Sequence, residues 1–178
     1  MFGFLRRDPH ERTGYELYGA AVAAARDPAL YGVIGVPDTL DGRFDLIGLH
    51  AFLLIRRLNG LPEPGPHLAQ AVFDAMFNDM DVNLREMGVG DLSVGKKVRA
   101  MWEAFHGRAT AYQAAIEAGD PAAFAAALAR NVWRGEPAPG AAALARAAFA
   151  QDFFLFRQEL AELRKGVVRF LPATEALA

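Results

Sequence analysis

The segment from Phe44 to Leu58 constrains the fold more than any other, because apolar side chains surround the helix that it predicts. At 100° per residue, its leucine, isoleucine and phenylalanine side chains reach every side of that helix. A helix that is apolar all round is either buried at the centre of a fold or pressed against a partner or a membrane. At this length we expect central burial, so the rest of the chain must supply the elements that cover it.

Glycine and proline divide the remaining chain into further segments with helical periodicity. Asn59-Gly60 has the chemistry of a helix end, and Asp120-Pro121 pairs an N-cap with proline at the first helical position. We find no internal repeat and no convincing strand. The sequence predicts about seven helical segments, over residues 11–26, 28–34, 44–58, 67–87, 91–118, 121–133 and 140–165, followed by a surface tail over 166–178.

The composition supports the prediction of a helical protein and excludes several classes of function. Hydrophobic residues make up 53% of the 178 residues, and alanine, the best helix former, is the most frequent of them. The absence of cysteine excludes disulfides, thiolate catalysis and cysteine-ligated metal centres. With 19 basic and 21 acidic residues, the chain lacks the positive charge that binds nucleic acid. We predict an all-α protein, a single-domain irregular helical bundle of about six to seven helices over residues 1–178.

The sequence contains no segment that we expect to enter or cross a membrane. No apolar run reaches the length of a transmembrane helix. Residues 1–8 carry charge too early for a signal peptide. We therefore expect a cytoplasmic protein.

Polar side chains within apolar helix faces are the candidates for a site. His50 lies in the central segment, where we expect a hydrogen-bonded core histidine, with a ligand or proton-transfer role as the alternative. Asp79 and Asn83 project into the apolar arc of their own helix, and a carboxylate buried there needs a partner. His50, Lys96 and Lys97 are the candidate partners. A tie between helices is the main interpretation; the alternative is a helical protein that binds a small ligand or lipid with these polar groups.

The segment 91–118 predicts an amphipathic helix whose apolar stripe, with Trp102 among its members, faces the core. Glu103 and His106 have the Glu-x-x-His spacing of di-iron carboxylate proteins, but the sequence has no second copy. No nucleophile motif or phosphate-binding loop is present. We expect no catalytic residue, no metal and no cofactor.

The predicted last helix has more apolar surface than one core needs. Phe149, Phe153 and Phe156 share an arc that continues to Leu160 and Leu163. Phe154 and Leu155 point elsewhere. Either neighbouring helices cover these side chains or they form an exposed patch, which is the mark of an interaction site.

Two stretches together resemble the ubiquinol–cytochrome c chaperone family, which includes mitochondrial assembly factors for cytochrome b and their alphaproteobacterial relatives. The resemblance spans about residues 31–133 and rests on a Leu-His pair in an apolar helix, an acidic segment that leads to Arg-x-x-Gly-Val, a following Lys-Lys, and a Gly-x4-Tyr. The residues that carry this family motif are His50, Asp79, Asp81, Asn83, Arg85, Gly88, Lys96, Lys97 and Tyr112.

The resemblance implies a role without enzymatic activity. Family members bind newly made cytochrome b and assist its entry into the cytochrome bc1 complex, which is the ubiquinol–cytochrome c reductase of the respiratory chain. It implies no small-molecule substrate. For this chain it suggests a bacterial cytoplasmic form, with peripheral contact at the cytoplasmic face of the inner membrane as a further expectation.

A holder of apolar membrane helices needs an apolar surface of its own. Our hypothesis is that Phe153, Phe154 and Phe156 border this surface together with the central helix 44–58. A second set of side chains is basic and is expected to meet anionic lipid or acidic client loops. These are Lys96, Lys97, Arg99 and Arg108.

Overall fold

The computed structural model describes residues 9–177, and no strand occurs among them. The all-α prediction is confirmed; the expectation about residues 1–8 falls outside the described residues. Six helices have twelve or more residues and three are short. In chain order they are α1 (Glu11–Ala25), α2 (Pro28–Gly32), α3 (Leu40–Asn59), α4 (Gly65–Glu86), α5 (Asp91–Glu117), α6 (Pro121–Val132), α7 (Ala141–Phe156), α8 (Leu160–Leu163) and α9 (Ala173–Ala176).

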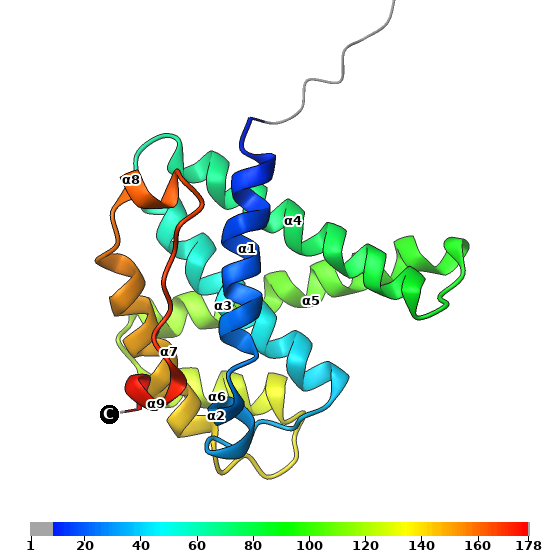
Figure 1. Ribbon diagram of the computed structural model, residues 1–178. Helices are drawn as coiled ribbons and strands as arrows, with labels where there is room; N and C mark the ends of the chain where they lie inside the picture. The colour runs from blue at the N-terminus through cyan, green and yellow to red at the C-terminus, as the bar shows by residue number, and fades with distance from the viewer. Residues whose placement is uncertain (1–8, 178) are drawn as a thin grey trace, which may run out of the picture.

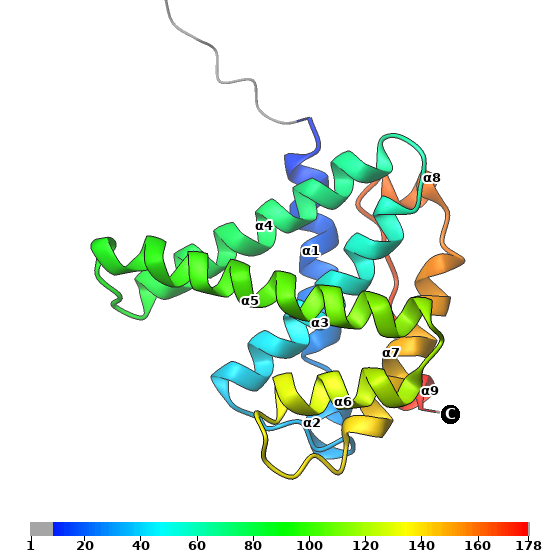
Figure 2. The same ribbon diagram turned by 180° about the vertical axis from the view of Figure 1, so that it is seen from behind.

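Helix α3 lies at the centre, as its all-round apolar sequence predicts. It packs against α1, α4, α6 and α7, and it runs between α1 on one side and α5 on the other (Figures 1 and 2). The hydroxyl of Thr39 caps its start by accepting from the amide of Gly42 at 3.1 Å, and it ends at Asn59. Half of its twenty residues are buried, and Leu46 and Leu54 are completely so.

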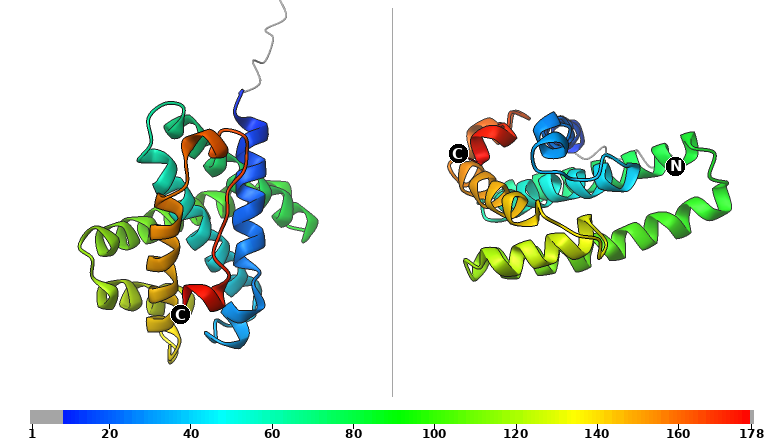
Figure 3. Two further views of the ribbon diagram at one scale, coloured as in Figure 1. Left: turned by 60° about the vertical axis from the view of Figure 1, so that its left-hand side comes forward. Right: turned by 90° about the horizontal axis from the view of Figure 1, so that it is seen from below.

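Helices α4 and α5 form an antiparallel pair whose turn projects beyond the rest of the molecule (Figures 1 and 3). We call this projecting part, residues 78–100, the arm. Gly88, with φ at 81°, makes the turn that ends α4. The guanidinium of Arg85 holds the turn by pairing with Asp81 and Asp91. Local ion pairs at the turn and the buried side chains of Met80, Leu84 and Val94 therefore hold the two helices of the arm together.

The prediction of one long helix over 140–165 is wrong. The helix α7 ends at Phe156, and α8 follows as a separate short turn in which Leu163 is completely buried. The chain after α8 runs back along the molecule between α7 and α1 (Figure 3). The apolar arc that the sequence predicts therefore stops at Phe156 instead of continuing through Leu163.

Two glutamines explain the break. Gln158 accepts from the amide of Arg169 at 2.9 Å and donates to its carbonyl at 2.6 Å. Gln151, which is buried, makes the same pair of bonds with Leu171, at 2.9 and 3.2 Å. These bonds satisfy backbone amide and carbonyl groups of the extended tail. They therefore stabilise a chain that turns back after α7 over one that continues the helix.

The packing of α1 on α4 generates a prediction about glycine. A Cβ added at Gly14 would lie 2.6 Å from the carbonyl oxygen of Ala71, whereas one at Gly19, in the same helix, would meet nothing within 4 Å. We expect Gly14→Ala to lower the free energy of unfolding by about 1–3 kcal/mol through overpacking. Gly19→Ala should raise it by about 1 kcal/mol through helix propensity. Urea denaturation of both variants measures the difference, and equal effects would contradict the close approach.

Candidate functional site

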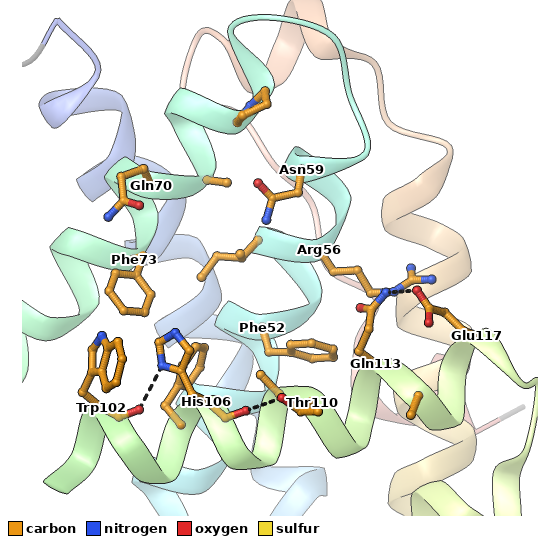
Figure 4. Close-up of a pocket in the computed structure, with 16 residues that line it drawn as sticks. Phe52, Arg56, Asn59, Gln70, Phe73, Trp102, His106, Thr110, Gln113 and Glu117 are labelled. Carbon is orange, nitrogen blue, oxygen red and sulfur yellow. Dashed lines mark hydrogen bonds between the residues drawn. The ribbon is translucent and has the colours of Figure 1, made fainter. Parts of the chain in front are cut away.

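A groove of about 780 Å³ lies between α3, α4 and α5 (Figure 4). Its lining is mainly apolar and rich in aromatic rings, and polar side chains stand at its rim. We call it the aromatic groove. Its rings are those of Phe52, Phe73, Trp102, Phe105 and His106, and its main rim residues are Arg56, Asn59, Gln70, Thr110, Gln113 and Glu117.

Trp102 and His106 form the exposed wall of the aromatic groove. Their rings lie 4.0 Å apart, and Nδ1 of His106 donates to the carbonyl of Trp102 at 3.0 Å. Phe73 reaches His106 from α4, with ring centroids 5.7 Å apart. These contacts fix the ring of His106, so the wall is a preformed surface (Figure 4).

The prediction that Trp102 belongs to the core is wrong. Its side chain is 45% exposed, although Phe105 and Tyr112 of the same stripe are buried. Helical periodicity identifies the apolar face of α5, but no helix covers that face at Trp102. The sequence therefore carries a signal for this site, a tryptophan in an apolar stripe, without showing that the stripe is left open.

Side chains at the rim of the aromatic groove bind neighbouring side chains in pairs. The guanidinium of Arg56 binds the carboxylate of Asp152 on α7 at 2.7 Å, while burial raises the pKa of that carboxyl. Gln113 donates to Glu117 on the same helix. Beyond Arg56, Asn59 and Gln113 a second hollow of about 520 Å³ begins and reaches α7. The groove and the hollow at the end of α7 therefore lie next to each other, with these three side chains between them.

His50 is a core histidine, as expected. It is buried, its Nδ1 donates to the carbonyl of Leu46 at 2.8 Å, and its ring lies 5.7 Å from that of Phe170. Burial lowers the pKa of His50, which keeps the ring neutral. The cavity beside it measures about 20 Å³, which is room for about one water molecule and no ligand.

Asp79 joins α4 to α1. Its carboxylate accepts from the hydroxyl of Tyr18 at 2.7 Å, and Asn83 donates to its carbonyl at 2.8 Å. Burial, with the added effect of Asp79, raises the pKa of Tyr18 far above its ordinary value. The interpretation as a tie between helices is confirmed, but the expected partners His50, Lys96 and Lys97 are wrong. Asp79 and Asn83 line a hollow of about 190 Å³, whereas His50 lies beside a different cavity, so the three residues do not form one polar cluster.

Four further residues of the family motif also have structural roles. Asp81, Arg85 and Gly88 shape the turn of the arm. Tyr112 is buried on α5, and its hydroxyl accepts from Asn131 of α6 at 3.3 Å. Burial raises the pKa of Tyr112 to about 12. Asp81, Arg85 and Gly88 thus shape the turn between α4 and α5, and Tyr112 ties α5 to α6.

The four basic residues do not share one surface. Lys96 and Lys97 are exposed on the arm, and Arg99 pairs with Glu103 one turn later at 3.1 Å. Arg108 is partly buried and binds the carboxylate of Asp45. The first three remain a candidate surface for acidic groups, whereas Arg108 holds α5 to α3.

Asp45 is the centre of an ion cluster that the sequence analysis missed. Its side chain is 3% exposed, with Arg108 at one oxygen and Nη2 of Arg134 3.0 Å from the other. Arg134, in the loop after α6, has a φ of 52°, which few residues other than glycine adopt. Burial raises the pKa of Asp45, while the two guanidinium groups oppose the rise.

The end of α7 carries the exposed aromatic patch that was one of two predicted outcomes. The side chains of Phe153 and Phe156 are 65% and 66% exposed, whereas Phe154 is half-buried. The guanidinium of Arg57 lies 5.1 Å from the ring centre of Phe156, and that of Arg157 lies 5.9 Å from the ring centre of Phe153. Each exposed ring therefore has a cation beside it.

The described residues contain no cluster of three or more histidine, aspartate or glutamate side chains that could hold a metal ion. Within residues 9–177, none of the helices combines the length and the apolar character needed to cross a bilayer.

Comparison with known proteins gives consistent results. The family model described as ubiquinol-cytochrome C chaperone matches residues 33–170. The chain is 27% identical over 97 residues to ubiquinol-cytochrome-c reductase complex assembly factor 1 of Xenopus laevis, a match that covers 54% of the chain and 48% of the relative. The chain thus matches about half the length of that relative. The crystal structure of the Cbp3 homolog from Brucella abortus superposes with a TM-score of 0.84 and 35% identity, covering 93% of this chain and 92% of that one.

The ion cluster generates a prediction about stability and its pH dependence. Arg108→Met leaves Asp45 buried with only Arg134 beside it, so we expect the free energy of unfolding to fall by about 3 kcal/mol near pH 7. The double variant Asp45→Asn/Arg108→Met should recover most of this loss, because no buried charge is left.

The sign of the pH effect follows from the raised pKa of Asp45. As the pH falls through the folded-state pKa, the folded protein takes up a proton that the unfolded chain does not yet bind. The deficit of Arg108→Met should therefore shrink between about pH 7 and about pH 5. Thermal melts at both pH values measure this, and a deficit that grows on acidification would contradict the assignment.

Proposed function

Because this chain belongs to the ubiquinol-cytochrome C chaperone family, we propose that it is an assembly chaperone of the cytochrome bc1 complex and that its client is newly made cytochrome b. The name of the Xenopus relative, a reductase complex assembly factor, supports the first part of the proposal. The second part requires a surface that receives apolar membrane helices before they reach their final place.

The aromatic groove is the observation that carries this proposal. It is open, it is about 780 Å³ in volume, and it lies between three helices. An apolar client helix bound in such a groove places side chains at every third or fourth position against the lining. Trp102 is suited to the centre of such an interface, since tryptophan is enriched among the residues that dominate binding energy.

The titratable residues of the groove support a role without enzymatic activity. His106 is hydrogen-bonded to the backbone of its own helix, and Glu117 accepts from Gln113. The one hydroxyl among the lining residues, that of Thr110, donates to the backbone carbonyl of His106 at 2.9 Å and not to its ring, and no lining carboxylate lies in a hydrogen bond with His106. Such an arrangement binds a partner and lacks a paired nucleophile and base. We therefore propose no cofactor and no small-molecule substrate.

The arm offers a second contact with the client. Lys96 and Lys97 are exposed on it, next to Arg99. We propose that they meet acidic loops of cytochrome b, at the cytoplasmic side of the inner membrane. Contacts of this kind guide association and depend on salt more than they add affinity.

The groove generates a prediction about client capture. We expect Trp102→Ser to weaken capture of newly made cytochrome b at least tenfold, because a central aromatic contact of this kind contributes about 2 kcal/mol or more. The measurement is crosslinking to radiolabelled cytochrome b during its synthesis. The melting temperature should stay close to that of the wild type, since Trp102 is 45% exposed.

Val33→Ser is the matched control, because Val33 is also exposed, at 68%, and does not line the groove. It should capture cytochrome b normally. Deletion of the gene should lower assembled cytochrome bc1 complex, and the Trp102→Ser variant should fail to restore it. Normal capture by Trp102→Ser would remove the groove from the proposal, and normal amounts of complex after deletion would overturn the function itself.

A further inference from the structure

The end of α7 has an unusual combination of exposed rings and cations. Phe153 and Phe156 are three positions apart, so their side chains leave the helix on one side. Each is about two-thirds exposed, with Arg157 and Arg57, respectively, beside the ring. We call these four residues the α7 patch. It lies on the side of the molecule away from the arm (Figures 1 and 2).

Arg57 has no carboxylate partner among the described residues. Its Nη2 donates to the carbonyl of Gln158 at 2.6 Å, and its buried Nε finds no acceptor. Its neighbour Arg56 is different, because it is paired with Asp152. The positive charge of Arg57 is therefore left uncompensated within the described part of the chain.

The surroundings of the α7 patch are basic, although the whole chain has a net charge of −2. In residues 56–57 and 152–169, six basic residues outnumber three acidic ones, and Glu16 of α1 approaches the same segment at Gly166. One of those acidic residues, Glu162, is already paired with Lys165 at 2.7 Å, and another, Asp152, with Arg56. The basic residues at the end of α3 and in the segment after α7 are Arg56, Arg57, Arg157, Arg164, Lys165 and Arg169.

We propose that the α7 patch docks this protein on an anionic membrane surface. The rings of Phe153 and Phe156 enter the boundary between headgroups and acyl chains, where aromatic side chains are favoured. Arg57 and Arg157 then bind lipid phosphates beside the rings that they already flank, because a guanidinium group binds phosphate through two parallel hydrogen bonds. The excess of basic residues around the patch adds attraction to the negative leaflet.

The charges favour a membrane over a second copy of the chain. A symmetric dimer through this patch would bring Arg57 and Arg157 against the same cations of the partner, with no acidic group in the patch to compensate. A membrane surface supplies the missing anions. It also accepts rings that protrude, whereas an apolar protein helix is better received by the concave groove next to it.

The position of the patch has a consequence that rests on the proposed function. The hollow that Arg57 and Phe156 border shares Arg56, Asn59 and Gln113 with the aromatic groove. Docking through the patch would bring one end of the client groove to the bilayer surface. A client helix could then pass between groove and lipid without crossing water.

Vesicle flotation of the full chain tests the proposal. Wild-type protein should float with vesicles of phosphatidylcholine and phosphatidylglycerol and stay behind with vesicles of phosphatidylcholine alone. Arg57→Gln/Arg157→Gln should lower partitioning onto the anionic vesicles about 30-fold, since each basic residue near such a surface contributes about a factor of five. Phe153→Ser/Phe156→Ser should lower it at least tenfold. The melting temperature of each variant is measured beside its partitioning.

Arg130→Gln/Arg146→Gln removes the same charge from exposed positions outside the α7 patch and should float like the wild type. Equal losses in this control and in Arg57→Gln/Arg157→Gln would overturn the proposal, as would failure of the wild type to float. So would α7-patch variants that bind vesicles normally but lose detergent-solubilised cytochrome b, because the patch would then belong to the client site. Trp102→Ser should float normally whatever its effect on client capture, so the two proposals fail independently.

Discussion

The structure depends on the burial of α3. A helix without a polar side needs cover from several elements, and α1, α4, α6 and α7 pack against it and bury half of its residues. Its one buried carboxylate is that of Asp45. Burial of this charge is unfavourable, so side chains from other elements must pair with it. Arg108 comes from α5 and Arg134 from the loop after α6, so the ion cluster ties two further parts of the chain to the central helix.

This arrangement also explains why a groove exists. The apolar stripe of α5 is held against the body at Phe105 and Tyr112, which are buried. At Trp102 the stripe is open to the aromatic groove, although Val94, further along the same stripe, is buried again. An apolar helix face that no other helix covers either stays exposed or binds a partner. The wall formed by Trp102 and His106 is held in place by its own contacts, which suits it to bind a partner.

Local chemistry made much of the fold predictable from the sequence. The apolar surround of α3 required its central position, and Asp120 caps α6 through the amides of Ala122 and Ala123 as its sequence indicates. The end of α7 was not predictable in this way, because it depends on Gln158 finding Arg169 in three dimensions. The partners of Asp45 lie 63 and 89 positions away, so periodicity and spacing carried no signal for them.

For the same reason, the candidate site could be predicted from the sequence only in part. The sequence shows how many apolar side chains there are and on which faces, but not which faces stay uncovered. Phe124 and Leu155 are completely buried, while Phe153, Phe156 and Trp102 are exposed. Burial of an exposed aromatic side chain by a partner contributes about 1.5–3 kcal/mol that folding has not used. Among the described residues, the exposed phenylalanine and tryptophan side chains are therefore concentrated in two places, the aromatic groove and the α7 patch, with the hollow lined by Arg56, Arg57 and Phe156 between them.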